Sequence, residues 1–427
     1  MTTKKKGKSP WKVLLAIVLG IICGTLTGVD GGLFGITFYS FYDVIGKLFI
    51  NALMLIVVPL VSASVITGIA RMGSESAFGR LGLKIFGFYL GTSLLAILIG
   101  LLSVNLLNPG AYFNAHGHDL VIPQEVAAEK LASSNKISIV SILLQIVPSN
   151  IVDVFHGQML GLIFFSLLFG YALSRIDHHP QSILMGFWQG IFQTTLAITD
   201  VIMKFLPIGV FCLVAKSFAT SGLDSFRSLA VFFITVIVGL SIFMFIGLPL
   251  LLKTVARVNP WLHFKAMGPA LVTAFSTSSS SATLPVTIEC VEKRAGVSNK
   301  ICSLVIPLGT SINMSGSALY ECVAAMFIAQ VYGVELSFTT QFSLVLLALV
   351  TSIGIAGIPS ASIVAIIVIL NAIGLPAEGI GLLFAVDRIL DMCRTTVNVF
   401  SDSCCAILVA RTEGEKEVLA RSTFEYA

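Results

Sequence analysis

Residues 386–403 read VDRILDMCRTTVNVFSDS and place Asp387, Asp391, Arg394, Asn398 and Asp402 in a segment that is otherwise apolar enough to be buried in lipid. At roughly 100° per residue these positions fall within about 80° of one another, so they share one face of a helix. An ionisable group at membrane depth costs about 2.5 to 3.5 kcal/mol and is retained where it faces a cavity, a partner or a substrate. This polar stripe is therefore the leading candidate for a functional site.

The composition indicates an integral membrane protein. The 427 residues are 56% hydrophobic and 11% charged, with a mean hydropathy of +0.96. A soluble chain cannot bury so much apolar surface. Apolar runs at 11–29, 48–70, 85–107 and 229–252 each reach the roughly 20 residues that a spanning helix needs. We expect an all-α polytopic protein of seven or eight spans.

Basic residues predict the orientation in the membrane. The lysines before the first apolar run place the N-terminus in the cytoplasm, and that run is too long for a signal peptide and lacks a cleavage site. The later clusters at 71–84, 253–265 and 293–300 fit the same inner side, so both termini are expected to be cytoplasmic in a plasma or inner cell membrane. This asymmetry explains the net charge of +4 and gives no reason to invoke nucleic acid.

Cysteine and histidine patterns do not predict a metalloenzyme. The eight cysteines contain no C-x-x-C pair, and the six histidines form no H-E-x-x-H pattern. Most of the cysteines lie in apolar segments, where they act as small buried hydrophobic residues.

Two serine-containing segments cannot cross lipid as plain helices: FSTSSSSATLP at 275–285 and SIGIAGIPSAS at 352–362. Each lies between apolar arms of roughly 10 to 14 residues, the length of a re-entrant arm. The alternative is a pair of ordinary loops. Two re-entrant hairpins that open from opposite sides, each followed by a span, would form an inverted repeat, the usual plan of a secondary transporter.

Between these segments, PLGTSINMSGSALYE at 307–321 interrupts a predicted span. Gly309, Asn313 and Gly316 stand where a continuous helix would carry Leu or Ile. Small residues there can serve close helix packing. An unwound turn would instead free backbone carbonyls that, with Asn and Asp oxygens, suit an alkali cation.

These four segments, in this order and spacing, resemble the signature segments of the glutamate transporter family of dicarboxylate and amino acid:cation symporters, in its acidic amino acid type. The resemblance covers nearly the whole chain. It implies a homotrimer in the lipid bilayer, with eight transmembrane helices and two re-entrant hairpins. It also implies an elevator movement of a transport domain against a scaffold. The implied units are 1–76 (scaffold, spans 1–2), 77–134 (span 3 and an extracellular loop), 135–222 (scaffold, spans 4–5), 223–411 (span 6 to span 8 with both hairpins) and 412–427 (cytoplasmic tail).

The resemblance also implies a substrate site. Arg394 would bind a side-chain carboxylate bidentately, and Asp391 would pair with an α-ammonium group, which favours an amino acid over a C4-dicarboxylate. The alternative is that these two residues only pair with each other. The remaining implied substrate residues are Ser278, Ser279, Ser280, Ser317, Thr395 and Asn398, with Ile358 in a gate at the tip of the second hairpin.

Three cation sites are implied in the same way. The first comprises Gly309, Asn313, Asn398 and Asp402. The second uses backbone carbonyls near Ser311, Met314, Ser352, Ile353 and Ile355, and the third uses Tyr89, Thr92, Ser93 and Asn313. This chain departs from the family at the third site, where NMSGS replaces NMDGT and Ser315 stands in the place of the acidic ligand. Two or three sodium ions are therefore expected.

Glu321 resembles the glutamate with which relatives countertransport a proton or potassium, because a buried carboxyl group can hold a proton. Its other reading is a hydrogen-bonded structural acid. The expected function is sodium-coupled uptake of L-glutamate or L-aspartate, and a proton-coupled amino acid or C4-dicarboxylate symporter is the alternative. A serine protease would need a general base, and the apolar arms at 266–292 around the serine tip contain no histidine. A pure channel would not need the Asp391 and Arg394 pair. The sequence therefore predicts neither an enzyme nor a pure channel.

Overall fold

The computed structural model describes residues 10–33, 36–73, 78–111, 147, 150, 159–221, 224–334, 336–354, 361–376 and 379–419. Within these ranges the fold is helical, apart from two short antiparallel strands, β1 (Gly32–Leu33) and β2 (Ile36–Thr37). The expected all-α class is confirmed.

Several of these helices have the length and composition of membrane spans. Among the described residues four pass both tests, at 38–70, 80–107, 227–256 and 299–331. A fifth candidate is a pair bent by 60°, α10 (His178–Ile202) followed by α11 (Leu206–Ser221). The molecule is thus a multi-pass membrane protein, and the total of eight spans stays a prediction.

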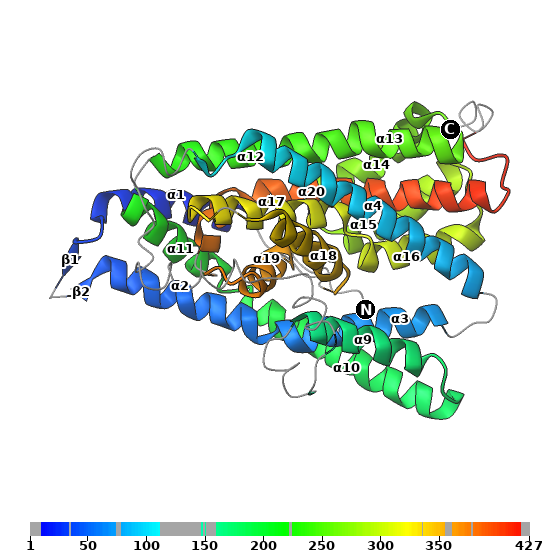
Figure 1. The fold of residues 1–427 in the computed structure, drawn as a ribbon, viewed down its shortest axis with the longest axis horizontal. Helices are drawn as coiled ribbons and strands as arrows, with labels where there is room; N and C mark the ends of the chain where they lie inside the picture. The colour runs from blue at the N-terminus through cyan, green and yellow to red at the C-terminus, as the bar shows by residue number, and fades with distance from the viewer. Residues whose placement is uncertain are drawn as a thin grey trace.

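One group of helices comes mostly from the first half of the chain. It comprises α1 (Pro10–Thr27), α2 (Phe38–Leu55), α3 (Val57–Gly73), α9 (Met159–Leu173), α10 and α11. Helix α11 packs against α1 and α2, and α3 packs against α9 and α10. Figure 1 shows α2, α3, α9 and α10 along one long side of the molecule.

The second group contains α4 (Phe78–Leu107) and the C-terminal helices. Helix α12 (Asp224–Ile242) continues through the π-helical turn η1 (Phe243–Gly247), α13 (Leu248–Leu251) and the π-helical turn η2 (Leu252–Ala256) along the opposite long side (Figure 1). The helix α20 (Ile380–Thr412) runs beside them. It contacts α4, α12 and most of the elements that lie between α12 and α20 in the chain.

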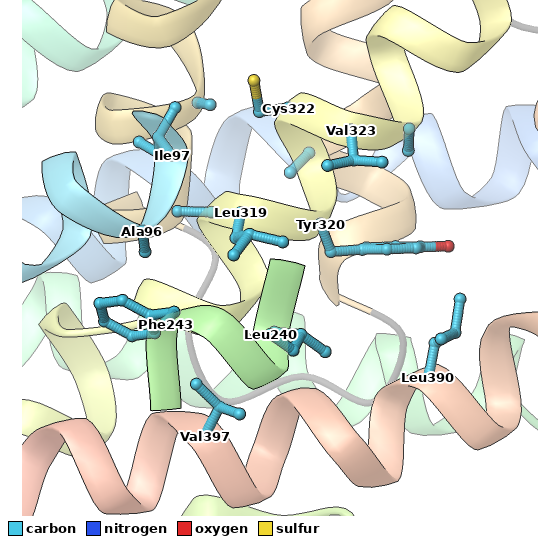
Figure 2. Packing of buried hydrophobic residues seen from close by; sticks show 14 of the residues in the cluster. Ala96, Ile97, Leu240, Phe243, Leu319, Tyr320, Cys322, Val323, Leu390 and Val397 are labelled. Atoms are coloured by element: carbon cyan, nitrogen blue, oxygen red, sulfur yellow. The ribbon is translucent and has the colours of Figure 1, made fainter. Parts of the chain in front are cut away.

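The helix α17 (Ser315–Val331) forms the centre of this group. In the span 299–331, 89% of the apolar window is buried, so protein rather than lipid encloses it. The helix contacts α4, α12 and α20. Figure 2 shows the side chains at this junction: Ala96 and Ile97 of α4, Leu240 of α12, Phe243 of η1, Leu319, Tyr320, Cys322 and Val323 of α17, and Leu390 and Val397 of α20.

Each serine segment includes the end of one helix and the start of a second helix that packs against it. The helices α14 (Pro260–Thr277) and α15 (Ser280–Glu289) pack against each other and are joined by Ser278 and Ser279. The π-helical turn η3 (Cys290–Arg294) follows α15. The helices α18 (Phe338–Gly354) and α19 (Ala361–Ala372) form the second pair, whose tip lies outside the described residues. The predicted helical pairs are confirmed, and their entry into a bilayer from opposite sides stays a prediction.

The predicted interruption at 307–321 is also confirmed. Helix α16 (Asn299–Ile312) ends before Asn313 and Met314, and α17 begins at Ser315. Neither intervening residue is helical, since their ψ angles are 75° and 51°. The end of α16 therefore presents carbonyl groups, and the start of α17 presents N–H groups, inside the second helix group.

Candidate functional site

The polar stripe lies on the single helix α20 and is buried as its periodicity predicts. Asp387, Arg394, Asn398 and Asp402 are each at most 5% exposed, and Asp391 is only partly buried. Buried charges at this density require partners, and the stripe finds them in its own residues and in α16 and α17.

Arg394 pairs with two carboxylates of its own helix. Its Nη2 donates to Asp387 Oδ1 at 2.9 Å and to Asp391 Oδ1 at 3.0 Å. The internal pair that the sequence left open is therefore present, and Asp387 is a second acid in it. Arg388 Nη1 lies 3.8 Å from Asp391 Oδ2, so two guanidinium groups face the two carboxylates and balance their charge when both are ionised.

The guanidinium keeps further donors. Its Cζ lies 3.9 Å from the ring centroid of Tyr320 on α17, a cation–π contact that holds the guanidinium plane. Neither Nε nor Nη1 has a hydrogen-bond partner among the described residues, although both are buried. An arginine has five N–H donors, of which Nη2 supplies two. Three donors therefore remain for an acceptor.

Asn398 binds the start of α17. Its Oδ1 accepts from the backbone N–H groups of Gly316 at 2.8 Å and Ser317 at 3.4 Å, and its Nδ2 donates to Ser317 Oγ at 3.2 Å. The first N–H groups of a helix lack intrahelical partners, and Asn398 satisfies two of them. Ser317 and Asn398, two of the residues implied to bind substrate, are therefore in direct contact.

Asp402 lies against the end of α16. Its Oδ1 accepts from Asn313 Nδ2 at 2.9 Å, and a Cβ at Gly309 would lie 2.6 Å from the same oxygen. Its Oδ2 is buried and has no partner among the described residues. The C-terminal end of a helix carries partial negative charge. This carboxylate oxygen, together with that end, suits a cation.

The predicted third cation site contains a hydrogen-bonded network of neutral groups. Ser315 Oγ donates to Asn313 Oδ1 at 2.9 Å and lies 3.2 Å from Ser93 Oγ and 3.1 Å from Ser401 Oγ. A hydroxyl offers one donor and two acceptor positions, so Ser315 is fully used. Two other predicted ligands flank this network: Thr92 Oγ1 lies 3.2 Å from Asn313 Oδ1, and Tyr89 donates to Val305 O at 2.5 Å.

Glu321 joins α17 to the second helical pair. It is 2% exposed, and its Oε2 accepts from Thr351 Oγ1 on α18 at 3.1 Å. The Ser362 side chain on α19 lies close to the same carboxyl group. Both arms of that pair thus lie against one carboxyl group, so the predicted coupling residue contacts the two helices that lead to the expected gate.

The three tip serines, Ser278, Ser279 and Ser280, lie at the turn between α14 and α15. Ser278 has a left-handed φ of 49°, and its buried Oγ has no partner among the described residues. Ser279 caps α15 by accepting from Ala282 N at 3.2 Å, and Ser280 is 8% exposed. Both α14 and α15 pack on α20, but no hydrogen bond of the described residues joins the three serines to the stripe. Their role in binding therefore stays a prediction.

The remaining predicted residues are only partly defined. Thr395 is buried on α20 beside Arg394, and Ser352 is buried in α18, which contacts α16. Ser311 and Met314 lie at the interruption between α16 and α17. The backbone of Ile353 belongs to α18, while Ile355 and Ile358 lie outside the described residues.

Sequence reasoning missed three contributors. Asp387 was placed on the stripe without a role, and Tyr320 and Ser401 were not singled out. The i, i+7 spacing of Asp387 and Arg394 could have indicated their pairing. Nothing local indicates the Tyr320 contact, which joins helices 74 positions apart in the chain.

Membrane-length helices, a broken helix and a buried ionic stripe are together characteristic of a secondary transporter. Comparison with known proteins identifies the protein family. Residues 10–412 match the Sodium:dicarboxylate symporter family, and the chain belongs to this family. Family membership confirms the prediction of a transporter rather than an enzyme.

Three relatives illustrate the range of the similarity. The Proton/sodium-glutamate symport protein of Bacillus caldotenax is 35% identical over 95% of this chain and 94% of its own. The Proton/glutamate-aspartate symporter of Escherichia coli K12 is 34% identical over 94% and 92%. Excitatory amino acid transporter 3 of Homo sapiens is 33% identical over 93% and 84%.

Proposed function

We propose that this protein is a secondary active symporter that takes up L-glutamate or L-aspartate together with sodium ions. The observation that carries the proposal is the buried Arg394, which retains three N–H donors after pairing with Asp387 and Asp391. The names of the relatives support an acidic amino acid as the substrate.

The two ends of the substrate would meet opposite charges on α20. The side-chain carboxylate binds the free donors of Arg394, in the bidentate geometry that a guanidinium favours. Asp391 has the greater exposure of the two acids, with 20% of its side chain accessible against 8% for Asp387. Asp391 therefore pairs with the α-ammonium group, while Asp387 continues to hold Arg394. The α-carboxylate binds the tip serines and the amide of Asn398.

Two sodium ions accompany each substrate. The first binds Asp402, whose Oδ2 is buried without a partner, because an unpaired buried carboxylate is costly and a cation neutralises it. The second binds carbonyl groups at the interruption between α16 and α17 and in α18. No third ion binds, because the hydroxyl network around Ser315 supplies no formal charge and the Ser315 hydroxyl itself has no free acceptor position.

The two packed helix groups support an elevator movement. Helices α4 and α12 to α20 form the transport domain, which carries the stripe and both helical pairs, and α1 to α3 with α9 to α11 form the scaffold. Each subunit would contain eight spans and an inverted repeat of two hairpins. Three subunits would form the assembly, with both termini of each in the cytoplasm. Closure of the second hairpin, which Glu321 contacts through Thr351, seals the bound substrate.

A specific observation favours one second candidate. Glu321 is buried, and its carboxyl group accepts a hydrogen bond from the hydroxyl group of Thr351, so it could carry a proton in each cycle. In that case protons replace sodium as the driving ion. A C4-dicarboxylate would satisfy Arg394 equally well but would leave Asp391 without an ammonium partner.

Competition for uptake tests the proposal. Purified protein in liposomes takes up labelled L-aspartate, and unlabelled L-glutamate, L-alanine and succinate are added in turn. We expect L-glutamate to compete strongly and L-alanine and succinate weakly. Equal competition by L-alanine would overturn the role of Arg394, and equal competition by succinate would overturn that of Asp391.

A further inference from the structure

The end of the described chain folds back onto the helix bundle. Helix α20 ends in a Schellman motif, in which Glu415 N donates to Ala410 O at 3.0 Å and Gly414 N to Arg411 O at 3.2 Å. Gly414 has a φ of 96°, a conformation that glycine adopts without strain. The chain therefore reverses here. We call residues 411–419 the C-terminal clasp.

The clasp is attached to the ends of α4 and η2. Lys84 of α4 donates to Thr412 O at 3.2 Å and forms an ion pair with Glu413. Arg411 Nε donates to Ala256 O at 3.0 Å, at the end of η2. These contacts fix the end of α20 against two helices of the second group.

The clasp also holds the segment that joins the first helical pair to α16. Leu419 N donates to Ala295 O at 2.9 Å, and both Val418 and Leu419 are at most 5% exposed. Glu415 Oε2 accepts from the backbone N–H of Ser298 at 3.1 Å. Ser298 immediately precedes α16, so a carboxylate sits at the start of that helix, where its charge is favourable.

Helices α16 and α20, with the residues directly before α16 and after α20, are therefore joined at two separate places. One is the clasp, between Ser298 and Glu415, and the other is the contact of Gly309 and Asn313 with Asp402. At 1.5 Å per residue these places lie about 16 Å apart along α16. Because helices transmit displacement along their axes, the contact at one end constrains the register at the other.

We propose that the C-terminal clasp is a positioning element of the cation site, in which Glu415 sets the register of α16 against α20 by holding the N–H of Ser298. This inference rests on the proposed sodium coupling for its transport readout. The clasp residues touch neither substrate nor cation, so their effect is transmitted through the two helices.

Three variants test the inference. Glu415→Ala removes the acceptor, Glu415→Gln keeps an acceptor oxygen, and Glu417→Ala alters an exposed glutamate of the same segment as the matched control. Each purified variant is measured for the half-saturating sodium concentration of L-aspartate uptake in liposomes. Hydrogen–deuterium exchange of peptides covering 299–303 and 309–315 is measured in parallel.

Glu415→Ala should raise the half-saturating sodium concentration about threefold to tenfold, the range that a lost hydrogen bond gives. It should also speed exchange in both peptides, whereas Glu415→Gln and Glu417→Ala stay near wild type. Faster exchange at 299–303 alone would overturn the inference, because the contact would then be only a local cap. Wild-type uptake without sodium would refute the sodium coupling, and exchange at 309–315 would still decide the role of the clasp.

Discussion

Gly309 on α16 and Asp402 on α20 are in direct contact, and a Cβ at Gly309 would lie 2.6 Å from Asp402 Oδ1. Real Cβ atoms do not approach an oxygen so closely, so any larger residue at 309 displaces the carboxylate or the helix. The contact explains why a glycine stands near the end of α16. It also provides a probe of the first cation site.

Gly309→Ala should therefore raise the half-saturating sodium concentration roughly tenfold or more, the scale of an overpacked core position. Gly268→Ala is the matched control, because a Cβ at this helical position in α14 meets nothing within 4 Å. Sodium titration of L-aspartate uptake measures both. An unchanged titration in Gly309→Ala would exclude Asp402 from the cation site.

Arg394 should select acidic substrates by the geometry of its guanidinium group as well as by its charge. Arg394→Lys retains a cation but loses the planar fork, so we expect uptake of acidic substrates to fall about a hundredfold or more, as it should in Arg394→Cys. Arg394→Cys should also gain some uptake of neutral amino acids. The measurement is initial uptake of labelled L-aspartate and L-serine at equal amounts of folded protein. Wild-type uptake of L-aspartate by either variant would contradict the assignment.

Asp391 should separate amino acids from plain dicarboxylates. Asp391→Asn removes the charge that pairs with an α-ammonium group, so the preference for L-aspartate over succinate should fall about tenfold or more, the scale of a lost charge-assisted hydrogen bond. Competition assays give this ratio directly. A preserved ratio would mean that Asp391 serves only to hold Arg394.

Ser315 should control the number of ions. Ser315→Asp adds a carboxylate beside Ser93, Asn313 and Ser401, and we expect it to add a third sodium ion to the cycle. Ser315→Asn is the neutral control and should leave the number at two. The number of sodium ions per substrate is obtained from the membrane potential at which net flux reverses in liposomes. A value of three in the wild type would refute the proposal that the neutral network around Ser315 binds no ion.

Periodicity and local composition predicted the features that depend on one segment at a time. The spacing of Asp387 to Asp402 placed the stripe on one face of α20, and the Gly, Asn and Ser residues after Pro307 predicted the break at Asn313. The serine tip between apolar arms predicted the pairing of α14 with α15. Each of these features follows from helix geometry or from residues that disfavour a continuous helix.

Contacts between distant segments could not be predicted in this way. The Arg394 contact with Tyr320 depends on how α17 lies over α20, and an aromatic residue within a helix carries no local signal. The clasp joins Glu415 to Ser298 across 117 positions, and its residues look like an ordinary charged tail. The sequence also could not show that the Ser315 hydroxyl uses all its hydrogen-bonding positions, because this depends on where the fold places Ser93 and Ser401 relative to Ser315.

The most direct test of the proposed function is the driving ion. Uptake of labelled L-aspartate into liposomes is measured under an inward sodium gradient and under an inward proton gradient of equal driving force, for the wild type and for Glu321→Gln. Sodium coupling through Asp402 predicts uptake with sodium alone in the wild type and no uptake with protons alone. Proton-driven uptake without sodium that disappears in Glu321→Gln would contradict it and make Glu321 the coupling residue.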